Sequence, residues 1–382
     1  MRSERKKLRS DASSSTIVHL SAAKGWRGGE QQIAYLLSEL EQRSIQQVLV
    51  CIKDSILEQF CKDEDITHYS FTPGIIPSIS FARCIYRISK STESPIFHSH
   101  DSHSHTACYL AYLLFGVKSP LVVSRRVDFQ IGQNFFSAKK YNAKNIAKII
   151  CVSNAIKEII SADIKAKEKL ITIHSGVNLE KFNTNSFTTN FKRSLNLPED
   201  HILIGNTSAI SDHKDYFTFV RTAKEVVKKH KNVHFVIIGD GPLRAEIEKF
   251  ISSLDLNEYI TLCGFRNDIK DILPQVNIFL FPSKTEGLGT SVLDAFAAKV
   301  PVVSTETGGI PEMIENGKTG LSCTVCDHNC LANAVERLIT DPTLRQTIVN
   351  NALLRLEDFD KSQTAEKTLA VYRELELDHF ER

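Results

Sequence analysis

The sequence predicts an α/β protein of two doubly wound domains, in which helices cover both faces of a parallel β-sheet. Short apolar runs alternate with longer amphipathic stretches over most of the chain. These runs are rich in Val and Ile and apolar on both faces, as is typical of parallel strands buried between two layers of helices. The chain has 382 residues, which is more than one compact core usually holds. Strand alternating with helix, twice over, therefore indicates two domains of the same class.

The expected strands and helices follow in chain order. The strands of the first half are Thr16–Leu20, Gln47–Ile52, Pro95–Phe97, Leu121–Ser124 and Lys148–Val152. Those of the second half are Ile202–Asn206, His234–Ile238, Tyr259–Leu262, Asn277–Phe281 and Pro301–Ser304. Helical spacing between them is clearest at Ile33, Leu36, Leu37 and Leu40, and again at Phe219, Ala223, Val226 and Val227.

Residues 16–184 and 185–360 are expected to form the two domains. The segment Asn183–Asn190 is rich in Thr, Asn and Ser and has weak periodicity, so it marks the boundary between them. Residues 1–15 are a basic N-terminus that is expected to be flexible. Residues 361–382 are expected to form a last helix.

Composition excludes several classes of function. Lys and Arg number 47 against 45 Asp and Glu, so no global charge suited to nucleic acid is present. The basic N-terminus has no apolar stretch after it, and the longest apolar runs, such as Cys108–Val117, are shorter than the ~20 residues of a spanning helix. The nine cysteines are an odd number, and several lie in strand-like runs. We therefore expect a protein of the reducing cytoplasm.

A turn with two glycines and two acids follows the expected strand Asn277–Phe281. It runs from Glu286 through Gly287, Leu288 and Gly289 to Thr290, and it leads into a helix that carries Asp294. Glycines let the backbone approach a ligand closely, and the free N–H groups at a helix N-terminus suit a phosphate. Glu286 and Asp294 place two carboxylates near one edge of the sheet, where one can bind hydroxyls of a sugar and the other hydroxyls of a ribose.

This segment resembles the E-x7-E element of the retaining glycosyltransferases of family 4. The resemblance implies the GT-B fold, in which two Rossmann-like domains face each other across a cleft. It also implies that Glu286 lies by the donor sugar, that Asp294 holds the ribose and that the amides of Gly287–Thr290 meet the diphosphate. Asp294 departs from the family pattern, which has a second Glu there. On this interpretation residues 16–184 bind the acceptor, residues 185–360 bind the donor, and the last helix crosses back to the N-terminal domain.

Other segments lie where this family would have them. Gly28 and Gly29 follow the first strand and resemble the glycine loop that approaches the donor diphosphate. Lys214 resembles the family lysine that meets the diphosphate, where a fixed cation stabilises the charge of the leaving group. The family's usual arginine, five residues earlier, is Ala209 here. Arg266 or another residue would have to supply the second cation.

The acceptor surface is predicted at the ends of the third and fourth strands of the N-terminal domain. His100, Asp101 and His103 lie in the first of these segments and Arg126 in the second. Many relatives have a histidine at the position of Arg126, facing the donor sugar and the acceptor. Arg126 stays protonated and cannot act as a general base, but it can hold an anionic acceptor or sugar group through two hydrogen bonds.

Two segments rich in metal-binding residues are interpreted without a metal. In an extended segment His98 and His100 point the same way, but no second cluster of ligands is evident in the sequence. Cys323, Cys326, His328 and Cys330 are spaced more tightly than the ligands of common zinc sites. That segment is expected to be an ordinary surface loop.

Basic residues recur in the N-terminal domain. Lys140, Lys144 and Lys148 are four residues apart and predict a basic stripe on a helix, and Arg83 and Arg87 make a shorter pair. A solvated helix face is the default interpretation. Transferases with lipid-linked acceptors dock on anionic membranes through such stripes, and each charge near the surface adds about 1 kcal/mol.

The sequence thus predicts a metal-independent retaining glycosyltransferase of the hexosyltransferase type, with no cofactor. It would move a sugar from a nucleotide diphospho-sugar, with UDP or GDP as the expected nucleotide, to a hydroxyl of a glycan or lipid-linked acceptor. Glu286, Lys214 and Arg126 are the expected catalytic residues. The expected role is the synthesis of an envelope polysaccharide or lipopolysaccharide, in the cytoplasm or at the inner face of the plasma membrane.

Three alternatives remain open at this point. A sugar-nucleotide epimerase or a phosphorylase would keep the GT-B fold, and the epimerases lack the arrangement of Glu286, glycine turn and Asp294. An NAD-dependent oxidoreductase would need a G-x-G-x-x-G turn after the first strand, and Trp26–Glu30 does not provide one. A nucleotide-sugar-binding module without activity is the third, and Ala209 and Arg126 are the residues that favour it.

Overall fold

The computed structural model describes residues 15–132, 135–182 and 190–380, which fall into two units. Unit 1 comprises Met1–Gly176 together with Lys361–Arg382, and unit 2 comprises Val177–Asp360. The boundary therefore follows Gly176, whereas the sequence placed it at residue 184. The expected seam lies outside the described residues except for Asn190, as does the basic N-terminus except for Ser15.

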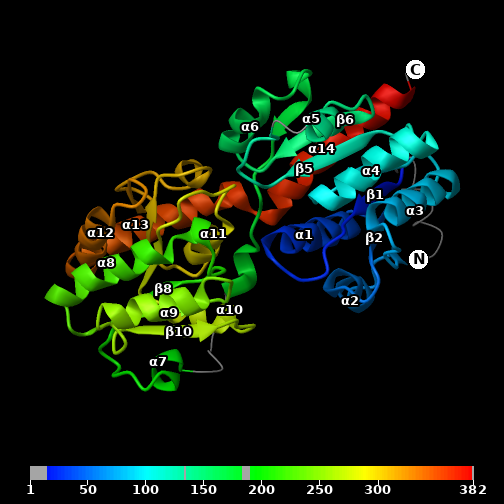
Figure 1. Cartoon of the computed structure of the whole chain (residues 1–382). Helices are drawn as coiled ribbons and strands as arrows, with labels where there is room; N and C mark the ends of the chain where they lie inside the picture. Colours follow the sequence, from blue (N-terminus) through cyan, green and yellow to red (C-terminus); the bar gives the residue numbers. More distant parts are fainter. Residues whose placement is uncertain (1–14, 133–134, 183–189, 381–382) are drawn as a thin grey trace, which may run out of the picture. The chain divides into compact units, whose positions relative to one another are not determined.

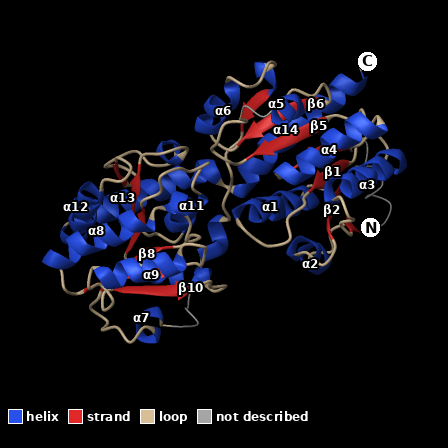
Figure 2. Cartoon of the chain, viewed as in Figure 1, coloured by secondary structure: helices blue, strands red, loops and turns tan. Residues whose placement is uncertain are grey.

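Unit 1 is built on one parallel sheet. Its strands are β1 (Ile17–Leu20), β2 (Gln47–Ile52), β3 (His68–Phe71), β4 (Ile96–Ser99), β5 (Leu121–Arg125), β6 (Ile146–Cys151) and β7 (Leu170–Thr172). They are hydrogen-bonded in the order β3-β2-β1-β4-β5-β6-β7, and helices lie on both faces of this sheet (Figure 2). The helices are α1 (Gly28–Gln42), α2 (Ile56–Asp63), α3 (Pro77–Ser91), α4 (Ser102–Phe115), α5 (Phe135–Tyr141), α6 (Asn154–Ser161) and α14 (Lys361–Phe380).

The last helix of the chain, α14, belongs to unit 1 and packs beside its first helix, α1 (Figure 1). Leu369 and Tyr372 of α14 are buried in one cluster with Leu40 of α1 and with Ile96 and Val122 of the central strands. A parallel sheet needs apolar cover on both faces, so α14 supplies part of the cover that this face of the sheet requires.

Unit 2 is built on a second parallel sheet. Its strands are β8 (Ile202–Asn206), β9 (Val233–Ile238), β10 (Ile260–Gly264), β11 (Ile278–Phe281), β12 (Val302–Thr305) and β13 (Leu321–Cys323), in the order β10-β9-β8-β11-β12-β13. Its helices are α7 (Phe191–Ser194), α8 (Tyr216–Lys229), α9 (Arg244–Ser253), α10 (Ile269–Ile272), α11 (Thr290–Ala297), α12 (His328–Thr340) and α13 (Pro342–Leu356). Unit 2 also contains the 3-10 turns η3 (Leu179–Phe182) and η4 (Asp212–Lys214).

Each sheet has one point where the strand order reverses. It lies between β1 and β4 in unit 1 and between β8 and β11 in unit 2. Loops that leave the carboxyl ends of the strands on either side of such a point diverge to opposite faces, and ligands of doubly wound sheets bind in the space between them. The residues that follow these four strands are therefore the first place to look for a site in each unit.

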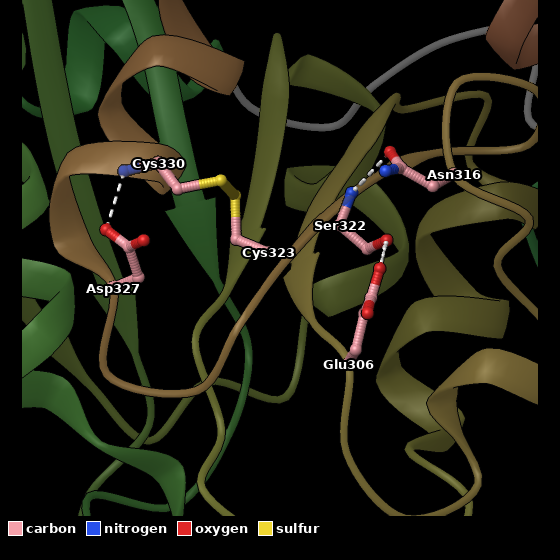
Figure 3. Close-up of a disulfide and its surroundings, with 6 residues drawn as sticks. All are labelled: Glu306, Asn316, Ser322, Cys323, Asp327 and Cys330. Carbon is pink, nitrogen blue, oxygen red and sulfur yellow. Dashed lines mark hydrogen bonds between the residues drawn. A yellow bond between two sulfur atoms is a disulfide. The ribbon is translucent and has the colours of Figure 1, made fainter.

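One pair of cysteines is bonded in unit 2, which the sequence did not predict. Cys323 at the end of β13 and Cys330 in the first turn of α12 form a disulfide, with 5.9 Å between their Cα atoms (Figure 3). The backbone amide of Cys330 also donates to Asp327 Oδ1 at 2.9 Å. Cys326 takes no part in this disulfide. Its thiol donates to Asp215 Oδ2 at 3.5 Å. The four closely spaced Cys and His residues therefore form a disulfide-closed loop.

The expected basic stripe of unit 1 is wrong. Lys140 lies in α5 but is buried, and its Nζ donates to Thr106 Oγ1 at 3.2 Å. Lys144 is exposed in the following loop, and Lys148 lies in β6 and forms an ion pair of 2.8 Å with Glu374. The three lysines thus lie in a helix, a loop and a strand and share no helix face. In the part of the chain that the structure describes, no helix combines the length and the apolarity that crossing a bilayer requires.

Candidate functional site

Lys214 and Glu286 meet at the carboxyl edge of the unit 2 sheet. Lys214 ends η4, which follows β8, and Glu286 lies in the turn that follows β11. The Lys214 ammonium donates a hydrogen bond to Glu286 Oε1, and the Ser283 hydroxyl donates to the same oxygen at 2.7 Å. The side chains of Lys214 and Glu286 are 15% and 8% exposed, so this is a largely buried ion pair. It lies at the reversal of strand order, where a ligand is expected.

Two glycines support the loop that carries Lys214. A Cβ at Gly239 would lie 2.1 Å from Ser208 O, and one at Gly241 would lie 2.3 Å from Ile210 O. The Ile210 amide donates to Asp240 O at 3.0 Å. Only glycine leaves room for this close approach of two backbone segments. The Gly239-Asp240-Gly241 turn therefore packs against the loop between β8 and η4, which explains two glycines that do not form a dinucleotide fingerprint.

A third glycine, Gly308, supports Glu286. Its φ is +53°, and a Cβ there would lie 1.8 Å from the carbonyl oxygen of Glu286. The same carbonyl accepts from the Gly309 amide at 3.3 Å, and the Thr307 hydroxyl donates to Lys284 O at 2.8 Å. The segment after β12 is thus hydrogen-bonded to the turn that follows β11. These contacts fix the backbone position of Glu286.

The helix α11 begins at Thr290, directly after Gly289, whose φ of +91° closes the turn. Leu288 is buried, so only its backbone can face a ligand. Asp294 lies one turn into α11, and its Oδ1 accepts a hydrogen bond of 3.0 Å from Lys181 Nζ in η3. Burial raises the pKa of Asp294, and the neighbouring Lys181 ammonium opposes this shift. Asp294 therefore already has a cationic partner inside unit 2.

Arg266 is not brought to this pair. It follows β10, the edge strand, and both oxygens of Asp268 accept from its guanidinium at 2.8 and 2.6 Å. Ala209, where the family pattern has an arginine, lies in the loop that packs against Gly239. Within the described residues, neither position provides Lys214 with a second cation.

In unit 1 the predicted glycine loop and Arg126 lie together. Gly28 and Gly29 are the first two residues of α1, and a Cβ at Gly29 would lie 3.9 Å from Arg126 Cδ. Arg126 directly follows β5 and is half-buried, with Nη1 at 3.4 Å from Ser175 Oγ. The first amides of α1 and the guanidinium of Arg126 thus lie near one another at the carboxyl edge of this sheet.

The other residues predicted for the acceptor have different surroundings. Asp101 caps α4: its Oδ1 accepts from the amides of His103 and Ser104 at 2.9 and 2.8 Å, and its Oδ2 accepts from Ala22 N at 2.7 Å. His103 is exposed in the first turn of α4, while His100 is buried. Asp101 therefore performs a structural role that an N-cap aspartate commonly has, and His103 is the accessible histidine.

Three buried histidines form a cluster in unit 1. The rings of His19, His98 and His100 place one possible ligand atom each within 4.8 Å of the others. His19 Nδ1 lies 3.0 Å from His100 Nε2, and His98 Nδ1 lies 2.5 Å from the Tyr372 hydroxyl. Burial lowers the pKa of all three rings, to about 3 for His19, and the charge of Arg126 lowers the pKa of His98 and His100 further. A divalent cation at this cluster would lie close to a guanidinium, which disfavours metal binding.

Sequence reasoning missed three residues of the unit 2 site. Ser283 bonds Glu286, Gly308 accommodates its carbonyl and Lys181 pairs with Asp294. Ser283 and the pair Gly308-Gly309 each follow an expected strand, so their positions in the sequence could have indicated them. Lys181 lies 113 residues before Asp294 and carries no local signal.

Two family models cover most of the chain. One described as Glycosyltransferase Family 4 matches residues 26–181, and one described as Glycosyl transferases group 1 matches residues 187–355. Together with the two parallel α/β sheets, these matches define the class: the chain is a member of the family 4 glycosyltransferases, which have the GT-B fold. The resemblance that the sequence suggested is thereby confirmed.

Three individual proteins illustrate the similarity. A capsular polysaccharide biosynthesis glycosyltransferase, CapM, of Staphylococcus aureus is 30% identical over 56% of this chain and 58% of its own length. The UDP-Gal:alpha-D-GlcNAc-diphosphoundecaprenol alpha-1,3-galactosyltransferase of Escherichia coli is 25% identical over 82% of this chain and 88% of its own length. The crystal structure of Anabaena HepE in complex with UDP and glucose superposes with a TM-score of 0.82 at 18% identity, covering 94% of this chain and 99% of that one.

The first three curated relatives are matched over 58%, 47% and 60% of their lengths, so the chain spans about half the length of these proteins. The structural likeness to HepE, at 18% identity, shows the fold.

Proposed function

We propose that this protein is a retaining glycosyltransferase that moves a sugar from a nucleotide diphospho-sugar to a hydroxyl acceptor. The observation that carries this proposal is the buried pair of Lys214 and Glu286 at the strand-order reversal of unit 2. Asp294 lies in the first turns of α11, the helix that follows Glu286. A cation, a carboxylate for sugar hydroxyls and a second carboxylate for ribose hydroxyls are the groups that such a donor needs. Membership of family 4 supports the same assignment.

The donor is assigned to unit 2. Lys214 and the amides at the start of α11 would bind the diphosphate, since a helix N-terminus favours phosphate oxygens. Negative charge grows on the diphosphate as the glycosidic bond breaks, so a fixed ammonium aimed at it lowers the barrier more than it tightens ground-state binding. Glu286 holds that ammonium in place through Oε1, and its own carboxylate lies beside the position assigned to the sugar.

Retention follows from front-face substitution. The acceptor hydroxyl attacks the anomeric carbon on the side from which the diphosphate leaves, and its proton passes to a diphosphate oxygen. This step needs neither a metal ion nor a separate general base, which suits an edge of unit 1 where Arg126 replaces the family's histidine. We assign to that edge Gly28 and Gly29, together with the acceptor-binding residues His103 and Arg126. The edge is supported from inside unit 1 by His100 and Asp101.

The product is proposed to be an envelope polysaccharide or lipopolysaccharide. The names of the Staphylococcus and Escherichia coli relatives support this class, because one concerns a capsular polysaccharide and the other an undecaprenol-linked acceptor. Work on the cytoplasmic side, where nucleotide sugars are made, and contact with an anionic membrane belong to the same proposal. Exposed Lys144, with Arg83 and Arg87 of α3, is available for such contact, whereas Lys140 and Lys148 are engaged internally.

The first test is a binding screen by calorimetry and thermal shift. The whole chain is titrated with UDP, GDP, ADP, CMP, their common sugar conjugates and NAD, in the wild type and in Asp294→Ala and Glu286→Ala. We expect one nucleoside diphosphate to bind and Asp294→Ala to weaken it. A response to NAD alone, or nucleotide binding that neither substitution changes, would contradict the proposal and favour an oxidoreductase or an unrelated site.

The second test is turnover. The nucleotide found in the screen identifies a set of sugar donors, and release of free nucleoside diphosphate is measured with simple glycoside acceptors. Glu286→Gln is the matched variant, since it keeps the size of the side chain and removes its charge. Nucleotide binding without any transfer in the wild type would favour a binding module over an enzyme.

A further inference from the structure

Arg126 is a half-buried cation at the carboxyl edge of the unit 1 sheet. Its Nη1 lies 3.4 Å from Ser175 Oγ, and its buried Nε has no hydrogen-bond partner among the described residues. Across the resolved ranges 15–132, 135–182 and 190–380, none of the ion pairs involves Arg126. Burial of a cation without an ion-pair partner is costly, and Arg126 is half-buried, so an anionic partner for its guanidinium is expected to come from outside the chain.

Its neighbour Arg125 is held by more internal contacts, although its buried Nε also has no hydrogen-bond partner among the described residues. Arg125 Nη1 donates to the Tyr141 hydroxyl at 3.0 Å, and Nη2 donates to Phe129 O. The guanidinium also lies over the Phe129 ring, 4.7 Å from its centroid. Arg125 therefore holds the loop after β5 in position, whereas no such network engages Arg126.

The groups around Arg126 suit an anion. The N-terminus of α1 begins beside it, where Gly29 leaves 3.9 Å to Arg126 Cδ, and a helix N-terminus carries positive potential. Ser124 and Ser175 line the cavity next to its side chain. The cavity measures about 20 Å³, which holds about one water molecule. The body of a ligand therefore stays outside this cavity.

The local charge balance is positive. Burial lowers the pKa of Arg126 to about 10, and the nearby Glu30 carboxylate raises it, so the guanidinium remains charged at neutral pH. The imidazoles of His98 and His100 are held neutral by burial and by Arg126, because their pKa values are lowered well below the usual range. The carboxylate of Asp101 is occupied by three backbone amides. Glu30 is thus the one acid whose charge acts on Arg126 in the described part of unit 1.

We propose that the acceptor carries an anionic group, a carboxylate or a phosphate, and that the terminal nitrogens of Arg126 bind it at the carboxyl edge of unit 1. A planar guanidinium matches either group through two parallel hydrogen bonds. The assignment to the acceptor rests on the proposed function, which gives the donor to unit 2. The anion site itself rests only on the contacts of unit 1.

The test uses the full chain and three probes of similar size. Methyl glucuronide carries a carboxylate, glycerol 3-phosphate carries a phosphate, and methyl glucoside is neutral. Binding is followed by protein-observed NMR at low and at high salt in the wild type, Arg126→Gln, Arg126→Lys and Arg83→Gln. Arg83 is an exposed arginine of α3 in the same unit and serves as the matched control.

We expect at least one anionic probe to bind more tightly than the glucoside. Arg126→Gln should weaken it about 10-fold or more, as loss of a charged hydrogen bond does, and Arg83→Gln should leave it unchanged. Arg126→Lys should retain part of the affinity, and this variant distinguishes lost charge from lost folding. The two anions separate the sources: preference for the glucuronide indicates a uronic acid, and preference for glycerol phosphate indicates a phosphate-bearing acceptor.

Binding of both anionic probes no tighter than that of the glucoside in the wild type, or anion binding that is indifferent to Arg126→Gln, would overturn this inference. Its failure can be told apart from failure of the proposed function, because nucleotide binding is assigned to unit 2. Arg126→Gln should leave the affinity for the nucleoside diphosphate unchanged. If the protein binds an anion at Arg126 but binds no nucleotide, the anion site is supported and the proposed transferase function is contradicted.

Discussion

Lys181 Nζ lies 3.0 Å from Asp294 Oδ1, so the carboxylate assigned to the ribose is paired with a cation from a segment 113 residues earlier. Without a partner, a carboxyl group in partly buried surroundings would protonate more readily. Lys181 therefore keeps Asp294 ionised and leaves its second oxygen available to a ligand. On the proposed function, Lys181 would belong to the donor site although no motif includes it.

This pairing predicts a change in the pH dependence of nucleotide binding. Burial raises the pKa of Asp294 and Lys181 lowers it, so Lys181→Met should raise that pKa further. Ribose hydroxyls donate to the ionised form, so affinity should fall as pH falls, and the fall should begin at a higher pH in Lys181→Met than in the wild type. Asp294→Asn should bind about 10- to 100-fold more weakly, which corresponds to about 1.5–3 kcal/mol.

Calorimetric titration with the nucleoside diphosphate across the acid range measures this shift. Lys318→Met is the control, since Lys318 is an exposed lysine of the same unit paired with Glu315. An acid limb that coincides in the wild type and Lys181→Met would show that Lys181 does not govern the ionisation of Asp294.

A second prediction concerns the pair of Lys214 and Glu286. Lys214→Met leaves the buried Glu286 carboxylate without its cation, and breaking a buried pair in this way costs about 3–5 kcal/mol of unfolding free energy. Glu286→Gln should cost less, since the amide oxygen still accepts from Ser283. The double variant should regain most of the stability lost in Lys214→Met, because no unpaired charge remains.

Urea unfolding of the four proteins gives the coupling energy between the two residues. Sugar transfer should behave differently from stability: both single variants and the double variant should lose about 100-fold or more in kcat, as when a transition-state donor is removed. Recovery of transfer together with stability in the double variant would be inconsistent with a role for this pair in the reaction.

A third prediction uses two glycines with similar backbone conformation. Gly308 and Gly317 have φ of +53° and +78°, but a Cβ at Gly308 meets Glu286 O at 1.8 Å while one at Gly317 meets nothing within 4 Å. Gly317→Ala should cost about 1–2 kcal/mol for the left-handed conformation alone. Gly308→Ala should cost roughly 1–3 kcal/mol more through overpacking, and it should also lower sugar transfer by displacing Glu286.

Thermal unfolding and a transfer assay on the two variants are sufficient. Gly317→Ala, once folded, should keep its transfer rate, since it lies outside the segments that touch Glu286. If the two variants lose the same stability and the same activity, the close approach of Gly308 to Glu286 is not what fixes the turn.

A fourth prediction concerns acid. Burial lowers the pKa of His19, His98, His100 and His105 in unit 1. In unit 2 it lowers the pKa of His234 to about 4. Below their unfolded pKa near 6.5 these rings gain protons only on unfolding, so each removes about 1.4 kcal/mol of stability per pH unit. Unit 1 should therefore lose stability faster than unit 2 as pH falls from 7 toward 5.

The single tryptophan of the chain, Trp26, packs in the core of unit 1 and reports on that unit. Its fluorescence in urea titrations at several pH values should show a steeply falling midpoint, while circular dichroism shows a second, less pH-dependent transition. Parallel loss of both transitions would mean that the buried histidines do not set the acid response.

The sequence predicted most of the fold because apolar strands carry their own signal. All ten expected strands are present, within two residues of their expected ends. The strands that it missed are β3, β7 and β13, and β7 and β13 have only three residues each. In β3 two of the four residues are exposed, so no apolar run marks it.

The site was predictable only where it is local. Glu286 lies in a turn, Asp294 lies in the helix that follows it, and Lys214 follows a recognisable strand. Asp101 was assigned to the acceptor although its carboxylate caps α4, because a capping acid and a ligand-binding acid look alike at a strand end. The pairing of Lys181 with Asp294 depends on contacts far apart in the chain, which residue patterns do not encode.

The chain leaves unit 1 at Gly176 and returns to it at Lys361, and these two residues touch: a Cβ at Gly176 would lie 2.6 Å from Lys361 Cα. Unit 2 is thus an insertion within unit 1, and the core of unit 1 requires Leu369 and Tyr372 from the end of the chain. On the ribosome, unit 2 emerges whole while the first sheet still lacks its covering helix. The unit that begins first is therefore the last to complete its core, and part of its apolar surface stays uncovered until the final helix has been made.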